Sequence, residues 1–212
     1  MSVSLEPTEA TRQLPVQKPS STRVIGKARY TFGLSYSPSG AWLVAIGGHK
    51  AYVCRTSDLK AGFTKLVSPE KLTCLAFHPT EDFFATGDNK GIVRLWYCLN
   101  DSIPTGVSDV EKKAPTTTLH WHAHAVSSLT FTANGAYLLS GGEEAVLVIW
   151  QLHTGKKEFV PRVGAPISSI TLSTVRSREE EYLLGLSDAS FAFVRSGTLR
   201  ISRTVAKVKL GA

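Results

Sequence analysis

Three histidines at alternating positions, His120, His122 and His124, are the residues of this chain whose spacing comes nearest to a reactive site. In an extended strand every second side chain points to the same face, so a strand here would place three imidazoles together. Such a group is a plausible beginning for a zinc site. No acidic residue or cysteine lies close in the sequence to complete the ligand set. A zinc-dependent enzyme is therefore kept only as a third alternative, and the sequence predicts no metal and no cofactor.

Patterns typical of catalytic sites are absent from the sequence. The motifs G-x-S-x-G, H-E-x-x-H and G-x-x-x-x-G-K-[ST] do not occur. A catalytic carboxylate pair needs two separate environments that give its two groups different pKa values. Three neighbouring residues in the acidic run Glu179-Glu180-Glu181 do not supply them. We therefore expect no enzymatic activity and no small-molecule substrate.

The composition predicts a folded protein without a membrane segment. Hydrophobic residues make up 42% and charged residues 19% of the 212 positions, which is enough apolar material for a buried core. The longest apolar runs, such as residues 41–46, are far shorter than the roughly 20 residues that span a bilayer. Three cysteines (Cys54, Cys74 and Cys98) are an odd number without a C-x-x-C pair, which indicates buried thiols in a reducing compartment.

The excess positive charge of +7 lies at the two ends of the chain. Residues 1–27 carry a balance of +2, residues 28–194 are neutral, and residues 195–212 contain five basic residues and no acid. A basic end can contact an anionic partner such as RNA, although a solvated tail explains it equally well. The candidate contact residues are Arg195, Arg200, Arg203, Lys207 and Lys209. Trp42 and Trp121 are further candidates, for stacking on bases.

Two segments, residues 72–96 and 126–150, repeat each other. Phe77 lies 19 residues before Trp96, as Phe131 lies 19 residues before Trp150. Each segment reads as three short strands separated by turn residues. Residues 31–54 and 167–194 are weaker copies, spaced 41 residues from their neighbours, and the polar stretch 97–115 accounts for the one longer spacing.

A unit of about 40–45 residues with four strands is typical of a β-propeller blade. We therefore predict an all-β fold with about four four-stranded blades and no amphipathic helix. The predicted division is a disordered polar tail over residues 1–27 and propeller blades over 28–212. The four blades are expected at residues 28–66, 67–118, 119–160 and 161–212.

The repeats resemble WD40 repeats, because turns of the Phe-x-Pro type are followed by Ser/Thr-Gly and by a strand that ends in Trp. In WD40 blades a His, a Ser or Thr, an Asp and the Trp form a buried hydrogen-bond network that locks the strands. The resemblance assigns this structural role in the third unit to His122, Ser140, Glu144 and Trp150. In the second unit Trp96 is retained, but Lys90 stands at the acidic position, so we expect no such network there.

A more specific resemblance covers about residues 70–210. The segments Leu-His-Trp-His, Leu-Leu-Ser-Gly-Gly and Lys-Glu-Phe-x-Pro-Arg-x-Gly-Ala (157–165) are similar to nucleolar WD-repeat subunits of the U3 small nucleolar ribonucleoprotein and small-subunit processome. This resemblance implies a scaffold in the processome's transcription-linked subcomplex, located in the nucleus and nucleolus. It further implies partners among WD40 and helical-repeat subunits, with contact to pre-ribosomal or U3 RNA as an option.

Two questions stay open from the sequence. Residues 28–212 supply roughly four blades, fewer than a closed seven-bladed ring, so we expect the later blades of a first propeller. Four blades would either close as an unusually small ring or leave open edges at both ends. Such edges would be completed by a partner or would self-associate.

The alternative function is that of a generic WD40 interaction platform or a substrate receptor of a cullin-type ubiquitin ligase. The arginine usual two residues beyond the Trp-Asp pair of such receptors is replaced here by Cys98 and Leu152.

Overall fold

A computed structural model of the chain describes residues 33–58, 63–99, 114–173 and 180–206. In this part of the chain sixteen β-strands and one short 3₁₀ helix, η1 (Thr56–Asp58), form the fold, and no α-helix occurs. The first eight strands are β1 (Gly33–Tyr36), β2 (Trp42–Gly47), β3 (Lys50–Arg55), β4 (Thr64–Val67), β5 (Leu72–Phe77), β6 (Phe84–Asp88), β7 (Ile92–Trp96) and β8 (Thr116–His120). The others are β9 (Val126–Phe131), β10 (Tyr137–Gly142), β11 (Leu147–Gln151), β12 (Lys157–Val160), β13 (Ile167–Leu172), β14 (Glu181–Leu186), β15 (Phe191–Arg195) and β16 (Arg200–Val205).

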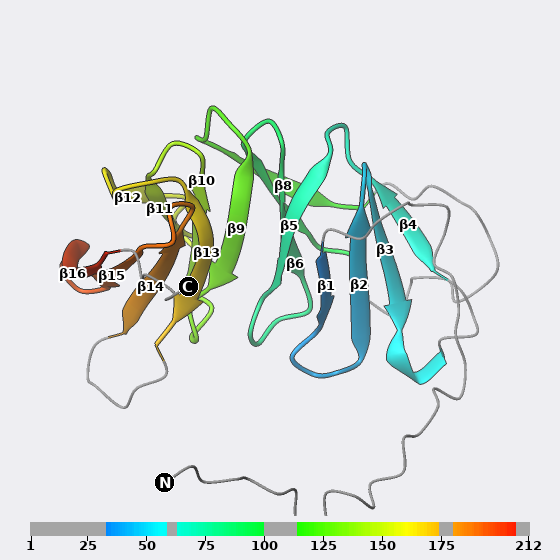
Figure 1. Ribbon diagram of the computed structural model, residues 1–212. Coiled ribbons are helices and arrows are strands. Elements are labelled where there is room, and N and C mark those ends of the chain that lie inside the picture. The colour runs from blue at the N-terminus through cyan, green and yellow to red at the C-terminus, as the bar shows by residue number, and fades with distance from the viewer. Residues whose placement is uncertain (1–32, 59–62, 100–113, 174–179, 207–212) are drawn as a thin grey trace, which may run out of the picture.

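Each group of four consecutive strands forms one antiparallel sheet, so the chain contains a first sheet (β1–β4), a second (β5–β8), a third (β9–β12) and a fourth (β13–β16). Within each sheet every strand pairs with the next along the chain. Short turns connect most of these pairs, such as residues 48–49 between β2 and β3 and residues 89–91 between β6 and β7. Figure 1 shows the four sheets standing side by side in an arc, from the first sheet on the right to the fourth on the left. The predicted all-β fold with four four-stranded sheets is confirmed.

The sheets meet through their first strands. Strand β5 packs against β1 on one side and β9 on the other, and β9 packs against β13. Alternate residues of each sheet point toward the preceding or the following sheet, and the apolar ones fill three clusters between neighbouring sheets. Residues with the lowest exposure in these clusters include Val44, Phe84, Leu138, Leu139, Leu147 and Leu184.

Hydroxyl groups add polar bonds across two of these junctions. The Oγ1 of Thr73 in β5 donates a hydrogen bond of 2.5 Å to the carbonyl oxygen of Val126, the first residue of β9. The Oγ of Ser127 donates in the same way to the carbonyl oxygen of Ile167, the first residue of β13. The backbone amide of Ile170 in turn donates to the Oγ of Ser128 at 3.0 Å. The second sheet is therefore fixed to the third, and the third to the fourth, by hydrogen bonds as well as by apolar packing.

Several sequence expectations lie wholly or partly outside the described residues. These are the disordered tail at 1–27, most of the polar stretch 97–115, and the acidic run at 179–181 except for its last two members. Cys54, Cys74 and Cys98 are buried and form no disulfide, and burial raises the pKa of the Cys74 thiol to about 12. Among the described residues no helix has the length and apolar character needed to span a membrane.

Candidate functional site

His122 is the centre of a buried polar network in the third sheet. It lies four residues before β9, is fully buried, and reaches Ser140 of β10 through Nε2 at 2.8 Å. The Nε1 of Trp150 in β11 donates to the same Ser140 Oγ at 2.8 Å. On the other side of the ring, His122 Nδ1 lies 3.2 Å from the Oε2 of Glu144, in the turn between β10 and β11. The structure thus brings together the four residues that the resemblance assigned to one network.

The donors and acceptors of this network fit one protonation state of His122. Because Trp150 donates to Ser140 Oγ, the serine hydroxyl is left to donate its own hydrogen to His122 Nε2. The Nδ1–H of the neutral imidazole then donates to the Glu144 carboxylate. The backbone amide of His124 donates to the other carboxylate oxygen of Glu144 at 2.6 Å. Every polar atom of the network therefore has a partner.

Burial decides the charge state of the imidazole. Desolvation lowers the pKa of His122 below its ordinary value of 6.5, and the nearby Glu144 carboxylate opposes this shift. For Glu144 burial acts to raise the pKa, but the hydrogen bond from the His124 amide and the proximity of His122 outweigh it and lower the pKa below 4.5. A neutral histidine beside an ionised glutamate is the state that these environments favour at neutral pH.

The order Ser140–His122–Glu144 has the connectivity of a serine hydrolase triad. Ser140 and His122 are each 0% exposed, however, and the serine oxygen already accepts the Trp150 indole N–H. A nucleophile must be reachable by its substrate. This arrangement therefore fits cross-linking of β10, β11 and the segment before β9 rather than acyl transfer.

The second sheet contains half of this arrangement. Trp96 Nε1 donates to the Oγ1 of Thr86 at 2.9 Å, as Trp150 does to Ser140. The buried Ser68, four residues before β5, stands where His122 stands before β9. The sequence prediction left Thr86 out, although its place just before Gly87 matches that of Ser140 before Gly141. The indole–hydroxyl bond is thus present in the second sheet. Ser68 and Lys90 stand there at the positions that His122 and Glu144 occupy in the third sheet.

The three alternating histidines do not share a strand. Strand β8 ends at His120, and His122 and His124 follow in the connection to β9. His122 is buried while the other two are exposed. The alternative of three imidazoles on one strand face therefore does not hold, because the chain turns from the outermost strand of one sheet to the innermost strand of the next. Within the described ranges no group of three His, Cys, Asp or Glu residues is arranged to hold a metal ion.

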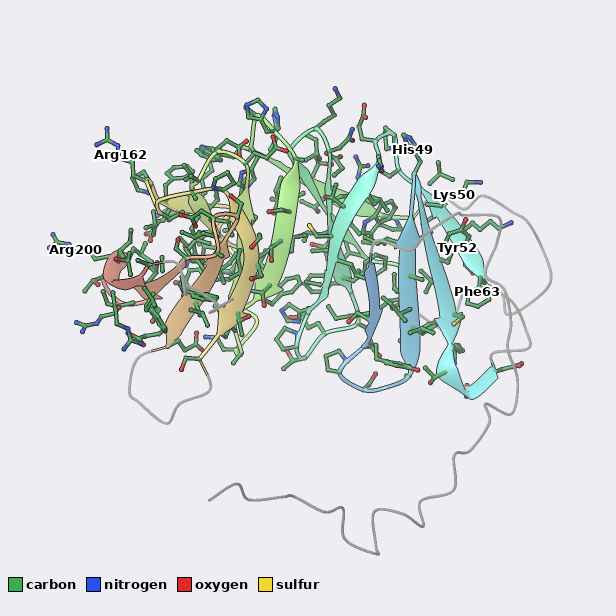
Figure 2. All side chains as sticks on the ribbon, viewed as in Figure 1. His49, Lys50, Tyr52, Phe63, Arg162 and Arg200 are labelled. Atoms are coloured by element: carbon green, nitrogen blue, oxygen red, sulfur yellow. The ribbon has the colours of Figure 1, made fainter. Side chains whose placement is uncertain are left out.

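The described basic candidates gather on the fourth sheet. Arg195 of β15 pairs directly with Arg200 of β16, and the Arg203 guanidinium lies 4.0 Å from the ring centre of Phe193. This register places the three arginines on one face of the sheet. The Nε of Arg195 lies 4.0 Å from the Oε1 of Glu181 at the surface, so this carboxylate partly balances the positive charge of Arg195. Figure 2 shows Arg200 pointing into solvent at the end of the arc. Lys207 and Lys209 lie outside the described residues.

The two tryptophans considered for base stacking are engaged within the protein. Trp42 is buried in the first sheet and has the Arg55 guanidinium 4.8 Å from its ring centre. Trp121 is partly buried, and its ring centre lies 4.9 Å from that of Phe159. Burial makes Trp42 inaccessible to a nucleic-acid base, and Phe159 covers part of the Trp121 ring.

A polar cleft that sequence reasoning missed lies between the third and fourth sheets. Its volume is about 410 Å³, and its lining includes Tyr137, Glu158, Glu180, Tyr182 and Ser196. Burial, followed by the negative charge of Glu180, raises the pKa of Tyr182 to about 12. These residues come from four separate segments, so only the packing of two sheets brings them together.

Comparison with known proteins places the chain among WD-repeat propellers. The model of the family described as "WD repeat-containing protein 75 first beta-propeller" matches residues 49–178. WD repeat-containing protein 75 of Homo sapiens is 34% identical over 172 residues, which are 73% of this chain and 20% of that protein. U3 small nucleolar RNA-associated protein 17 of Schizosaccharomyces pombe is 45% identical over 78 residues, or 37% of this chain and 9% of that protein.

The chain spans about a fifth of the length of the mammalian relatives that it matches. A solved structure, a chain from the crystal structure of the mitotic checkpoint complex, has a TM-score of 0.66 and 18% identity, covering 83% of this chain and 52% of that chain. This likeness supports the fold alone. The WD40-type propeller fold predicted from the repeats is thus confirmed, and because the family model matches more than half of its residues, the chain belongs to the family of the WD repeat-containing protein 75 first β-propeller.

Proposed function

We propose that the chain serves as a non-catalytic scaffold subunit of the small-subunit processome and supports pre-ribosomal RNA transcription and early processing. The observation that carries this proposal is the family match over residues 49–178, together with 45% identity to a relative named for its association with U3 small nucleolar RNA. The same relatives support a location in the nucleus and nucleolus.

The architecture fits a scaffold. The His122–Ser140–Trp150 network and the Trp96–Thr86 bond stiffen the second and third sheets from within. Rigid sheets present loops and outer strands to partners at fixed positions, which is how propellers bind other molecules. We assign the partners to the WD40 and helical-repeat subunits of the particle, with the four blades at residues 28–66, 67–118, 119–160 and 161–212 as the units that they contact.

The basic face of the fourth sheet is the part of the proposal that concerns RNA. Arg195, Arg200 and Arg203 lie at the outer end of the arc, where phosphate groups can approach without entering a cleft. Phosphate contacts need accessible positive charge rather than a shaped pocket. We therefore propose these arginines, with Lys207 and Lys209, as contacts for pre-ribosomal or U3 RNA.

Sedimentation of the epitope-tagged chain in nuclear extract tests this function, with each fraction probed for U3 RNA and for processome proteins. We expect co-migration with U3 RNA in a large particle. A longer version containing further propeller sequence serves as the matched control for assembly. If the longer version and the chain both sediment slowly, away from U3 RNA, the processome assignment is wrong.

A further inference from the structure

The polar cleft between the third and fourth sheets has no part in the His122 network or in the basic face of the fourth sheet. It lies where turns of the two sheets meet, since Asn134 comes from the turn between β9 and β10 and Gly197 from the turn between β15 and β16. Both of these residues are exposed, so the cleft opens to solvent. Its volume of about 410 Å³ falls within the roughly 300–1,000 Å³ of ligand pockets.

Part of the lining is apolar and aromatic. Ile149 of β11 is buried and Leu199 is partly buried, and both line the cleft. Tyr137, the first residue of β10, and Tyr182, the second residue of β14, belong to the same apolar cluster between the two sheets. The carbon stem of a long side chain can pack on such a surface while its polar end meets polar groups.

Two carboxylates complete the lining, one from each sheet. Glu158 lies in β12 and is exposed, whereas Glu180 directly precedes β14 and is partly buried. Alternation along the chain places Glu180 on the same face as Tyr182, toward the third sheet. Glu181 lies on the opposite face, beside Arg195.

Neither carboxylate of the cleft has a counter-charge within the described part of the chain. None of the described lining residues is Lys, Arg or His. No ion pair among the described residues involves Glu158 or Glu180, although the neighbouring Glu181 has Arg195 at 4.0 Å. The cleft is therefore acidic, and a positively charged group from outside the chain would complete it.

Tyr182 responds to the charge of both carboxylates. Its side chain is 3% exposed, and burial is the main reason that its pKa is raised to about 12. The negative charge of Glu180 is the next cause, and Glu158 of the other sheet contributes in the same direction. A hydrogen bond with Ser196 acts to lower the pKa. The two carboxylates thus act on one shared space, although they come from different sheets.

A second cleft, between the second and third sheets, provides a comparison within the same molecule. Its volume is about 340 Å³, and its lining contains the aromatic residues Phe83 and Tyr97. Among its described lining residues Glu81 is accompanied by His78 and His153. The strongly acidic lining is therefore particular to the cleft between the third and fourth sheets and is not a general feature of these junctions.

The chemistry of the lining distinguishes between possible occupants. RNA phosphates would be repelled by the two carboxylates. A lysine ammonium group is a compact, strongly hydrated point charge, whereas an arginine guanidinium is planar, donates five N–H bonds in a fixed fork and stacks on aromatic rings. Carboxylates on two walls beside tyrosine rings match the guanidinium best.

We propose that this cleft binds an arginine side chain carried by an extended segment of a partner protein. The guanidinium donates charge-assisted hydrogen bonds to Glu158 and Glu180 and packs beside the ring of Tyr137. The carbon stem covers Ile149 and Leu199. This site rests on the cleft alone and does not depend on the processome assignment.

An NMR titration of the full chain with ¹³C-labelled tyrosine tests the proposal. The probe is a capped peptide with a single arginine flanked by glycines. We expect saturable shifts of the ring signals of Tyr137 and Tyr182. Glu158→Gln and Glu180→Gln each keep the side-chain size and remove one charge, so each should weaken binding about threefold to tenfold. Glu81→Gln is the matched control, because it removes the same charge from the second cleft, and it should leave the affinity unchanged.

Three further probes separate charge, shape and the source of the arginine. A peptide with citrulline keeps the length and planarity of arginine without its charge, so it should not bind. A peptide with lysine keeps the charge without the planar fork and should bind more weakly than the arginine peptide. Free L-arginine carries an α-carboxylate that the acidic cleft repels, so it should also bind more weakly than the capped peptide.

Several results would overturn the proposal. These are tyrosine signals that do not shift, a citrulline or lysine peptide that binds as tightly as the arginine peptide, and free L-arginine that binds as tightly as the capped peptide. An equal loss of affinity in Glu81→Gln and in the two cleft variants would overturn it as well. None of these measurements involves U3 RNA or other processome components, so their failure is distinct from a failure of the proposed function.

Discussion

His122 shows how one buried side chain makes the stability of a β-sheet depend on pH. Its ring is 0% exposed and is held between Ser140 and Glu144. Burial lowers its pKa below 6.5, so the folded chain resists the proton that the unfolded chain binds. The network is therefore strongest with the imidazole neutral, the state in which its single N–H donates to Glu144.

From this geometry we predict that the chain loses stability as the pH falls from 7 to 5. Between the ordinary pKa of His122 and its lowered folded value the unfolded state binds more protons, so the free energy of unfolding rises with pH and falls on acidification. This range lies above the titration of Glu144, whose pKa is lowered from 4.5. Urea unfolding at several pH values measures the effect.

His122→Ala should weaken this pH dependence and cost about 2 kcal/mol at pH 7, because it leaves the Glu144 carboxylate and the Ser140 hydroxyl without their partner. His153→Ala is the matched control, since His153 is exposed. An unchanged pH dependence in His122→Ala would contradict the assignment of the neutral state to His122.

A second residue-scale prediction concerns the turn between the second and third strands of the later sheets. Gly91, Ala145 and Ala189 occupy the same place in the second, third and fourth sheets, with φ of 81°, 55° and 64°. A side chain in this left-handed region costs about 1–2 kcal/mol, so replacing alanine by glycine relieves strain in the folded chain. The greater backbone freedom of glycine in the unfolded chain offsets part of this stabilisation. Ala145→Gly should therefore stabilise the chain by about 0.5 kcal/mol.

The opposite change at Gly91 should destabilise the chain. A Cβ there would lie 2.1 Å from the carbonyl oxygen of His122, so Gly91→Ala adds a backbone clash to the strain of its φ. We expect a loss of about 2 kcal/mol. Thermal and urea unfolding of both variants give the comparison, and equal effects of the same sign at the two positions would contradict it.

At the scale of the elements, the junction between sheets combines apolar packing with a few hydroxyl bonds. Alternation in a strand accounts for the end of β9, where the apolar Leu129 and Phe131 are buried on either side of the partly buried Thr130. It did not predict that Thr73 and Ser127 bond across to the next sheet. Those partners are 53 and 40 residues away in the chain, and they meet only because one sheet packs against the next.

Thr73→Val keeps the shape of this side chain and removes its hydroxyl, so it isolates the bond to Val126. We predict a loss of about 1 kcal/mol in the free energy of unfolding. Ser168→Ala is the control, because Ser168 is exposed and bonds only within its own sheet, where water can replace it. A loss in Ser168→Ala as large as in Thr73→Val would mean that the hydroxyl acts within a sheet rather than between sheets.

At the scale of the whole molecule, the net charge of +7 is unevenly placed, and three of its arginines share one face of the fourth sheet. Binding of single-stranded RNA through this face should weaken as salt rises, because each phosphate contact releases a counterion. Replacing both Arg200 and Arg203 by alanine should reduce the slope of log K against log salt by about 1.4. Filter binding at several salt concentrations measures this slope.

Lys50→Ala is the matched control for that measurement, since Figure 2 shows Lys50 at the opposite end of the arc from Arg200. It should leave the slope unchanged. Equal reductions from the control and the double variant would mean that RNA responds to overall charge and not to the face of the fourth sheet.

The sequence by itself determined the repeat, the strands and the network. Spacings of 41 residues and the recurring Gly and Trp positions predicted four-stranded units, because a strand pair and its turn are local features of the chain. The resemblance of the third unit to WD40 repeats identified His122, Ser140, Glu144 and Trp150 as one group. Thr86 was missed, although its offset from Gly87 carried the signal.

Only the tertiary structure decided what the repeats leave open to solvent and what they bring together. His120 and His124 separate from His122 because the chain passes from the outer strand of one sheet to the inner strand of the next. The cleft around Tyr182 depends on which sheets are neighbours. The physical reason is that alternation assigns a side chain to a face of its sheet, whereas burial requires a second sheet against that face.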